Sequence, residues 1–384
     1  MAEDESDVTA PLWMERYAEV TGFEWLGDRF VPGSDGSRIA PYLFVVTVWF
    51  LVTVGFATLR YLHVGRFPLL ETPGMFVLLP AWLFVVFVAR RMRDRYAEVV
   101  EGLPAPVRIQ GEGEPRYAAW VRRFGVSRRA ESEPLAEMFP GRLRWVLVAG
   151  GIGLHLAWFV IDPSPMQTFT QVYGTTLASL YFYAVVPGIF YVFGGELIAL
   201  YLGVHVLLPL KVTMTDRIDF TDPLLYGGLR PVGRLLRDSS GAFLLLLSLF
   251  AVFETVSAGT DPLDPYSRLL VFGGIGFGVA MFVLPVYWLH RYLRGKKESK
   301  IREIKADIED AGPEDDLDSL PEARPRTLDE TSEYTHEYLR LIYVDNMKEF
   351  PIDVGLVLEF LFVLLLPYAA HVSSIFVFEQ LIHL

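Results

Sequence analysis

The sequence predicts an all-α, polytopic membrane protein with seven transmembrane helices. Hydrophobic residues make up 52% of the 384 residues, and the mean hydropathy of the chain is +0.34. These residues are concentrated in blocks close to the ~20 residues that a helix needs to cross a bilayer. The pattern excludes a soluble globular protein. The seven apolar blocks are residues 41–60, 75–89, 143–161, 177–210, 241–258, 268–290 and 352–382.

The composition excludes several classes of chemistry. The chain has no cysteine, so disulfides, thiolate metal sites, iron–sulfur clusters and cysteine nucleophiles are absent. Its 34 basic residues face 46 acidic ones, and the net charge is -12. Only 6 of the basic residues are lysines. A strongly acidic solvated surface indicates a halophilic source, which we expect to be an archaeon. It also argues against a nucleic acid as partner, because phosphate binding needs clustered positive charge.

The first element is an acidic N-terminal segment, residues 1–40. It has no basic region ahead of an apolar run, so it does not resemble a cleaved signal peptide. We expect it to stay on the protein, on the cytoplasmic side of the membrane. Residues 41–294 should then form six transmembrane helices, with cytoplasmic loops at 90–144 and 211–240 and short loops outside.

The fourth apolar block, residues 177–210, is long enough for two short spans. No polar loop divides it, and Pro187 and Gly188 provide a break in its middle. Proline interrupts helical hydrogen bonding, and membrane helices tolerate it as a kink. We therefore expect one long kinked helix.

Orientation follows from the arginines and lysines between the blocks. Loops on one side carry 31 of them, and the other side carries only Arg60, Arg66 and Arg268. The positive-inside rule then places the N-terminus in the cytoplasm and the C-terminus outside, as in a multi-pass protein of the cell membrane. This is opposite to the orientation of a G-protein-coupled receptor.

A cytoplasmic extension follows the sixth span. Residues 295–327 are predicted to continue that span as a polar helix and then form an acidic, Pro-rich linker. Residues 328–350 should form a second cytoplasmic helix. Its apolar residues recur at three- and four-residue spacings and make a stripe that requires a partner surface. The stripe consists of Tyr334, Tyr338, Leu341 and Val344. Residues 351–384 form the last span, which is the candidate pore helix.

Ionisable residues within the apolar blocks are candidate functional groups, since a charge costs about 2.5–3.5 kcal/mol at the centre of a membrane helix. Those nearest the predicted helix ends, Glu254, Glu379 and His205, are expected to be interfacial. For Glu196 and Glu359, a satisfied hydrogen bond between helices and a role along an ion or solute path both remain open. The full set is His155, Glu196, His205, Glu254, Glu359, His371 and Glu379.

The last span carries a polar stripe. At 100° per residue one face contains a carboxylate, small residues and hydroxyls, as expected of a pore-lining or helix-contact face. Both interpretations remain open for this face alone. The stripe comprises Glu359, Leu366, Ala370, Ser373 and Val377, with Ser374 and Gln380 on its flanks.

Three aspartates, Asp216, Asp219 and Asp222, follow the fourth span at three-residue intervals. Carboxylates beside a membrane can hold Mg²⁺ for attack on a lipid diphosphate, as in membrane prenyltransferases. Those enzymes carry two such motifs, whereas this chain has one. Capping and turn formation before Pro223 is the alternative, and we expect it rather than an Mg-dependent lipid transferase.

The chain resembles the insect gustatory and odorant receptor superfamily of seven-span ion channels. Length, orientation, the predominance of cytoplasmic mass and a last helix split into a cytoplasmic half and a membrane half are similar. Gustatory members end in Thr-Tyr, five mainly hydrophobic residues and Gln-Phe. Here Ser373-Ser374, IFVFE and Gln380-Leu381 occupy that register, and the glutamine is identical.

The resemblance implies a homotetramer whose cytoplasmic helices pack together and whose pore is lined by the last helix. It also implies a ligand pocket in the outer half of the bundle. Its candidate residues are Trp158, Phe159, Tyr181, Tyr183 and Phe253. The expected partners are further copies of the chain, the lipid bilayer, inorganic ions and a small-molecule ligand. We expect no enzyme activity, cofactor or resident metal. The alternatives are a secondary transporter that uses intramembrane carboxylates, and a non-transporting scaffold or sensor.

Overall fold

The computed structural model describes most of the chain, and every regular element in the described residues is a helix. The prediction of an all-α protein is confirmed for these residues. They are residues 11–30, 36–65, 67, 74–105, 135, 137–161, 163–258, 265–311, 328–351, 354–370 and 372–373.

Two short helices precede the first long helical run. α1 spans Trp13–Val20 and α2 spans Phe23–Phe30. The first long run consists of α3 (Gly36–Phe50), the π-helical segment η1 (Leu51–Gly55) and α4 (Phe56–Val64). Both short helices pack against α3, and α1 also contacts α11, which lies far along the chain.

The next helices reverse direction. α5 (Met75–Glu101) begins beside α3, where the Trp49 indole N–H donates to the Met75 carbonyl over 2.8 Å. α5 continues twelve residues beyond the expected end of the second span at residue 89, through a series of arginines. α8 (Gly141–Ile161) runs back, and α9 (Ser164–Tyr173) caps the end of the bundle that is poor in charge.

The fourth apolar block is one continuous helical run from Thr175 to Thr215. Two π-helical segments interrupt its α-helical geometry, and the first contains Pro187. A π-helical turn accommodates an additional residue, so these segments change the direction of side chains without a loop. The run consists of α10 (Thr175–Leu180), η3 (Tyr181–Phe190), α11 (Tyr191–Leu202), η4 (Gly203–Leu207) and α12 (Leu208–Thr215).

The C-terminal part contains the longest helices. α13 spans Arg230–Ala258, and α14 spans Pro265–Ala311 as a single helix of 47 residues. α15 (Leu328–Asp345) packs along the polar end of α14. After a turn at residues 346–351, α16 (Val354–Leu364) begins, and the chain continues as helix from residue 366 to residue 370.

Six helical runs are long and apolar enough to cross a membrane, so the structure is that of a multi-pass membrane protein. The seventh expected span is not among these six. It falls on α16 and its continuation, of which residues 361–370 form a shorter apolar helix. The six runs are Gly36–Val64, Met75–Glu101, Gly141–Ile161, Thr175–Thr215, Arg230–Phe253 and Phe272–Ile308.

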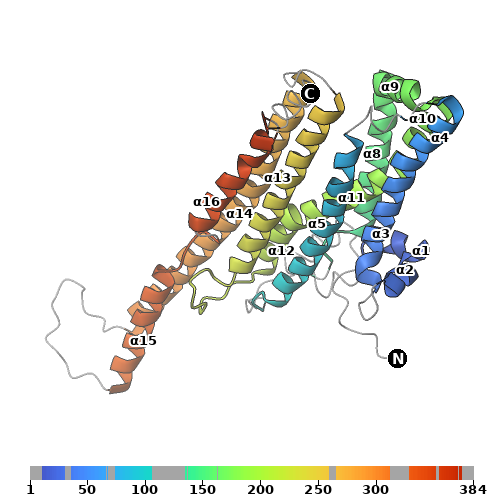
Figure 1. Ribbon diagram of the computed structural model, residues 1–384. Coiled ribbons are helices and arrows are strands. Elements are labelled where there is room, and N and C mark those ends of the chain that lie inside the picture. The colour runs from blue at the N-terminus through green and yellow to red at the C-terminus, as the bar shows by residue number, and fades with distance from the viewer. Residues whose placement is uncertain are drawn as a thin grey trace.

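The helices form two neighbouring groups that share α5 (Figure 1). One group contains α3, α8 and α11, and the other contains α13, α14 and α16. α5 packs against both α3 and α13, and the fourth run packs on α8 and crosses toward α14. One continuous apolar core joins the two groups.

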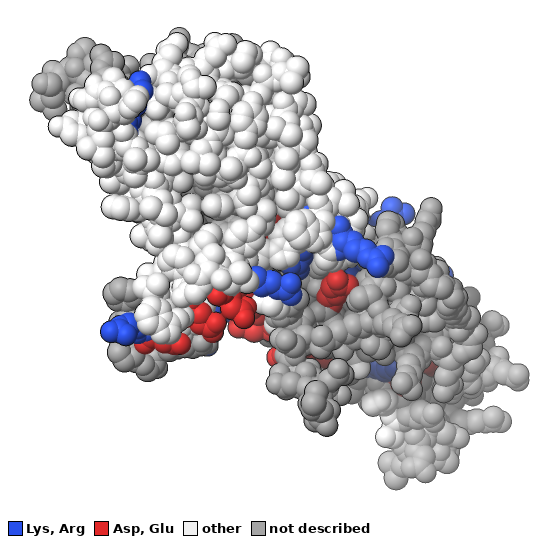
Figure 2. Space-filling model, turned by 90° about the vertical axis from the view of Figure 1, so that its right-hand side faces the viewer, with Lys and Arg blue, Asp and Glu red and all other residues white. Residues whose placement is uncertain are grey.

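Charged side chains gather at one end of the bundle. On the face shown in Figure 2, arginine, lysine and acidic residues lie over the lower part, whereas the upper part is almost uncharged. We refer to the former as the charged end. It is where α5 ends at Glu101, α8 begins at Gly141, α12 ends at Thr215 and α13 begins at Arg230.

Candidate functional site

The last helix lies on the outside of the bundle. α16 packs on α13, where Val363 lies beside Gly241, and the rings of Tyr368 and Phe272 of α14 have centroids 6.3 Å apart. The other side of α16 has no neighbour in the described chain and exposes large apolar residues. They are Leu358, Leu361, Phe362 and Leu365. In a single chain this surface faces either lipid or another protein.

The predicted pore stripe is described only in part, because the side chain of Glu359 lies outside the described residues. Glu359 lies on α16, and Leu366, seven residues later, is 38% exposed. Ala370 is half-buried and Ser373 is exposed. The stripe is therefore accessible in the single chain as far as the structure describes it. Ser374, Val377 and Gln380 lie outside the described residues.

The helix α15, which the sequence predicts to be cytoplasmic, is only partly covered within the chain. Val344 is 1% exposed, and Met347 in the following turn is also buried in the same chain. Leu339 and Ile342 are 60% and 44% exposed. Val344, at the C-terminal end of the expected apolar stripe, is thus covered within the chain. The apolar surface of α15 that stays exposed lies on the side of Leu339 and Ile342.

The turn between α12 and α13, residues 216–229, is held by α14. Asp216 adopts a left-handed backbone conformation at the end of α12, with φ of 53°. Its carboxylate accepts hydrogen bonds from the Tyr292 hydroxyl at 2.6 Å and the Lys296 ammonium at 2.7 Å. This charged hydrogen bond fixes the turn to α14.

The same turn is joined to the α15–α16 connection. The Asp222 carboxylate accepts three backbone N–H groups of its own turn, those of Leu224, Tyr226 and Gly228. Its carbonyl accepts the Tyr343 hydroxyl of α15. Partial burial, together with the nearby Asp222 and Asp219 carboxylates, raises the pKa of Tyr343 above its ordinary value.

Lys348 completes this connection. Its backbone N–H donates to the Leu225 carbonyl over 2.7 Å, and its ammonium donates to the Tyr226 hydroxyl over 2.9 Å. The ammonium also lies 4.3 Å from the centre of the Tyr226 ring, a cation–π distance. The chain segment that precedes α16 is therefore attached to the turn between α12 and α13.

The three aspartates perform separate structural tasks. The Asp219 carboxylate accepts the backbone N–H and hydroxyl of Thr221, whereas Asp216 and Asp222 have the partners given above. The segment is a series of turns and not a helix. In the described part of the chain, no three carboxylate or histidine side chains gather as metal ligands do. Capping and turn formation explain these residues.

Glu196 is buried at 0% exposure on α11 and holds α1 in place. Its two carboxylate oxygens accept the backbone N–H groups of Trp13, at 2.6 Å, and Met14, at 3.2 Å. These are unpaired donors at the start of α1, where a helix favours negative charge. The Arg144 guanidinium lies 3.6 Å away. Glu196 thus makes a satisfied contact, which was one of the two alternatives from the sequence.

His205 is also buried, at 1% exposure, and its predicted interfacial position is wrong. Its ring lies in η4, with Nδ1 2.6 Å from the Met281 carbonyl of α14 and Nε2 2.8 Å from the Ser239 hydroxyl of α13. Pro285 explains this contact. Proline has no N–H, so the carbonyl four residues earlier, that of Met281, loses its helical partner. The histidine replaces that partner and connects three spans.

His155 makes an equivalent contact at the other end of the bundle. Its Nε2 lies 3.1 Å from the carbonyl of Phe182 in η3. In a π-helix the N–H of Pro187 would have bonded to residue 182, five positions earlier. A histidine from a neighbouring helix again satisfies a carbonyl released by proline. The sequence signal is a proline within an apolar block together with a histidine in another block.

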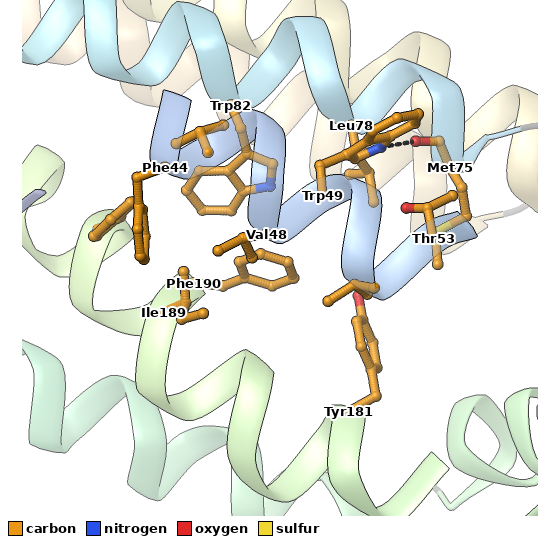
Figure 3. Close-up of a pocket in the computed structure, with 13 residues that line it drawn as sticks. Phe44, Val48, Trp49, Thr53, Met75, Leu78, Trp82, Tyr181, Ile189 and Phe190 are labelled. Carbon is orange, nitrogen blue, oxygen red and sulfur yellow. Dashed lines mark hydrogen bonds between the residues drawn. The ribbon is translucent and has the colours of Figure 1, made fainter. Parts of the chain in front are cut away.

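Several of the predicted ligand-pocket residues lie in one aromatic cluster. Phe159 and Tyr181 both pack against Phe182, with ring centroids 4.9 and 5.1 Å apart. Phe159 and Tyr183 lie side by side, with ring centroids 6.5 Å apart, and Phe253 pairs with Phe250 on α13. The side chain of Trp158 lies outside the described residues. Among the predicted residues whose side chains are described, Tyr181 alone lines a crevice, which opens between α3–η1, α5 and η3–α11 (Figure 3). This crevice is lined by the first, second and fourth runs.

No protein-family model, curated protein or solved structure matches this chain.

Proposed function

We propose that this protein forms a homo-oligomeric ion channel of the cell membrane, with four subunits and a pore lined by the C-terminal helix. In this proposal α16 and its continuation are the seventh span, the N-terminus is cytoplasmic and the C-terminus is outside. The charged end of the bundle is then the cytoplasmic end, in agreement with the 31 to 3 distribution of basic residues.

The peripheral position of α16 is the observation that carries the proposal. A helix that lines a pore between subunits must lie at the surface of each subunit, with one side attached to its own bundle. α16 packs on α13 by one side and exposes the other. Leu366 and Ser373 of the predicted stripe lie in the accessible part. Rotational symmetry would bring identical stripes together around an axis.

The attachment of the α15–α16 connection supports a route for gating. Lys348 and Tyr343 bind the turn at residues 216–229, and Tyr292 and Lys296 bind the same turn from α14. A shift of the fourth run or of α14 is transmitted through this turn to the base of α16. In this proposal a ligand that binds among the first four runs gates the pore by moving the fourth run, and the turn carries that movement to α16.

The transporter alternative uses Glu196 and Glu359 as coupling acids. A coupling acid must exchange protons or ions with water on at least one side. In this structure both oxygens of Glu196 are occupied by α1, and the side chain has no exposed surface. This arrangement argues against Glu196 as a coupling acid and weakens the transporter alternative.

The oligomeric state of the purified protein in nanodiscs tests this proposal. Mass photometry should find four subunits. Leu339→Lys with Ile342→Lys should shift the particles toward monomers, because both side chains are exposed in the single chain. Val20→Lys, at an 86% exposed site on α1, is the matched control and should leave the tetramer intact. A monomeric wild-type protein would contradict the channel.

A further inference from the structure

We propose that the cleft between α1–α2 and α5 binds a zwitterionic phosphate ester, which carries a phosphate at one end and an ammonium group at the other. The phosphoethanolamine head group of a lipid has this chemistry. The inference does not depend on the channel proposal, because binding is measurable without any ionic current.

The cleft lies at the charged end of the bundle and has the start of α3 as its floor. α1, α2 and α5 all pack on α3. Glu15 of α1 also forms salt bridges with Arg90 and Arg93 of α5, so the two walls are held in a fixed relation. The cleft between them has a volume of about 880 Å³. That is room for a head group of many atoms, within the range of small-molecule sites.

The two walls of this cleft differ in charge. Among the described lining residues, α5 contributes four arginines and only two acids, whereas α1 and α2 contribute three acids and no basic residue. With Arg38 of α3, the described lining has five basic and five acidic side chains and is neutral as a whole. A neutral lining has no net attraction for a simple anion or cation. Its separated charges are instead complementary to a molecule that carries both.

Most of these side chains already have partners within the chain. Besides the two salt bridges of Glu15, Arg93 lies 3.3 Å from the Asp94 carboxylate, and Arg95 lies 2.7 Å from that of Glu98. These pairs shape the cleft. The groups that are free to bind a ligand are therefore the charged side chains without a partner.

The unpaired charges lie on different walls. Arg91 of α5 is exposed, and in the described part of the chain its guanidinium forms no ion pair or hydrogen bond. Glu19 of α1 and Glu24 of α2 are exposed acids whose carboxylates also have no partner there. A guanidinium matches the geometry of a phosphate, and the carboxylates accept hydrogen bonds from an ammonium group.

The position of the cleft favours a lipid as the source of this head group. Phe87 also lines the cleft and is 45% exposed, and Arg91 follows it one helical turn later on the same face of α5. The second apolar block ends at residue 89, between these two side chains. A lipid with its chains beside Phe87 brings its phosphate to Arg91 and its ammonium group toward the acids of α1 and α2.

Native mass spectrometry of the full-length protein in detergent tests the inference. The probes are phosphatidylethanolamine, phosphatidylglycerol with the same chains, and free phosphoethanolamine. Phosphatidylethanolamine should bind more tightly than phosphatidylglycerol, roughly two- to fivefold, the effect of one exposed ion pair. Free phosphoethanolamine should compete weakly, because it makes no contact with Phe87. Equal competition by the free head group would assign the same zwitterion to solution instead of the bilayer.

Variants identify the two ends of the ligand. Arg91→Gln should weaken both lipids roughly three- to tenfold, because a charged hydrogen bond to phosphate is lost. Glu19→Lys with Glu24→Lys makes both walls basic and should reverse the order, so that phosphatidylglycerol binds more tightly. Arg16→Gln, at an exposed arginine of α1 outside the cleft, is the matched control and should bind both lipids as the wild type does.

Three outcomes would overturn the inference. Equal or tighter binding of phosphatidylglycerol to the wild type would show a site for anions only. An unchanged order of the two lipids in the variant with Glu19→Lys and Glu24→Lys would show that these acids do not meet the ligand. The same loss in Arg91→Gln and Arg16→Gln would show a general attraction of lipids to basic side chains.

Discussion

The carboxylate of Glu196, in the fourth apolar block, accepts the backbone N–H of Trp13, which lies 183 residues earlier in the chain. A buried acid in a membrane helix thus serves as the cap of a short N-terminal helix. α1 is further held by Glu15, which forms salt bridges with Arg90 and Arg93 of α5. α1 is therefore an integral part of the charged end of the bundle.

Removal of this cap should release α1. Glu196→Leu leaves the Trp13 and Met14 N–H groups without acceptors and Arg144 without its counter-ion, and we expect a loss of about 3–5 kcal/mol in unfolding free energy. Hydrogen–deuterium exchange of residues 12–20 should increase strongly. Glu196→Gln keeps one acceptor oxygen and should have a smaller effect. Glu19→Gln, at an exposed site on α1, is the control. Unchanged protection of α1 in Glu196→Leu would contradict this role.

The contact between His205 and Met281 should depend on Pro285. His205→Phe leaves the Met281 carbonyl buried and unpaired, at a cost of about 1–3 kcal/mol. Pro285→Ala supplies an N–H to that carbonyl, so most of this cost should disappear in the double variant. The measurement is a double-mutant cycle of thermal unfolding in detergent. His155→Phe combined with Pro285→Ala is the control pair and should be additive. Additive effects of His205→Phe and Pro285→Ala would refute the explanation.

Tyr343 should make the protein sensitive to alkaline pH. Its pKa is raised in the folded state. As the pH rises past about 10, the Tyr343 hydroxyl therefore loses its proton at a lower pH in the unfolded chain than in the folded protein. The stability that Tyr343 contributes is present below that pH and is lost as the pH rises. The unfolding midpoint should therefore fall more steeply in the wild type than in Tyr343→Phe. Tyr338→Phe, at an exposed tyrosine of the same helix, should follow the wild type, and parallel curves for wild type and Tyr343→Phe would disprove this contribution.

The orientation is testable because the chain has no cysteine. A membrane-impermeant maleimide should label His63→Cys only from outside the cell, since His63 is exposed near the end of α4 that is poor in charge. It should label Arg302→Cys, on the polar part of α14, only after the cytoplasmic side is made accessible. The reverse pattern would require the opposite orientation.

Much of the fold was predictable because apolar blocks and polar helices leave periodic signals. The single fourth run and the extension of the sixth span beyond residue 294 follow from uninterrupted patterns in the sequence. The contact of Glu196 with Trp13 was not predictable, because a backbone N–H leaves no trace in the sequence at such a separation. The prediction for His205 was wrong because it considered only the position of this residue along its own helix. The carbonyl that His205 contacts has no helical partner because of a proline in another helix.

The candidate sites were less predictable than the fold. Glu359 and Leu366 were placed on one stripe by helical periodicity, and the turn at Leu365 then alters that periodicity. The crevice lies between η1 and η3, and π-helical turns have no simple sequence signature. Among the expected pocket residues whose side chains are described, Tyr181 alone lines it, because an aromatic residue alone does not reveal which neighbouring helix it meets.

The most direct test of the central claim is the current through purified protein in planar bilayers under a KCl gradient, for the wild type and for Glu359→Gln. The proposal predicts a cation-selective current in the wild type, since a ring of carboxylates attracts cations to the pore mouth. In Glu359→Gln the reversal potential should move toward zero. Glu101→Gln, at the exposed end of α5, is the control and should resemble the wild type. A wild-type protein that passes no current, or a selectivity that Glu359→Gln leaves unchanged, would contradict a pore lined by the last helix.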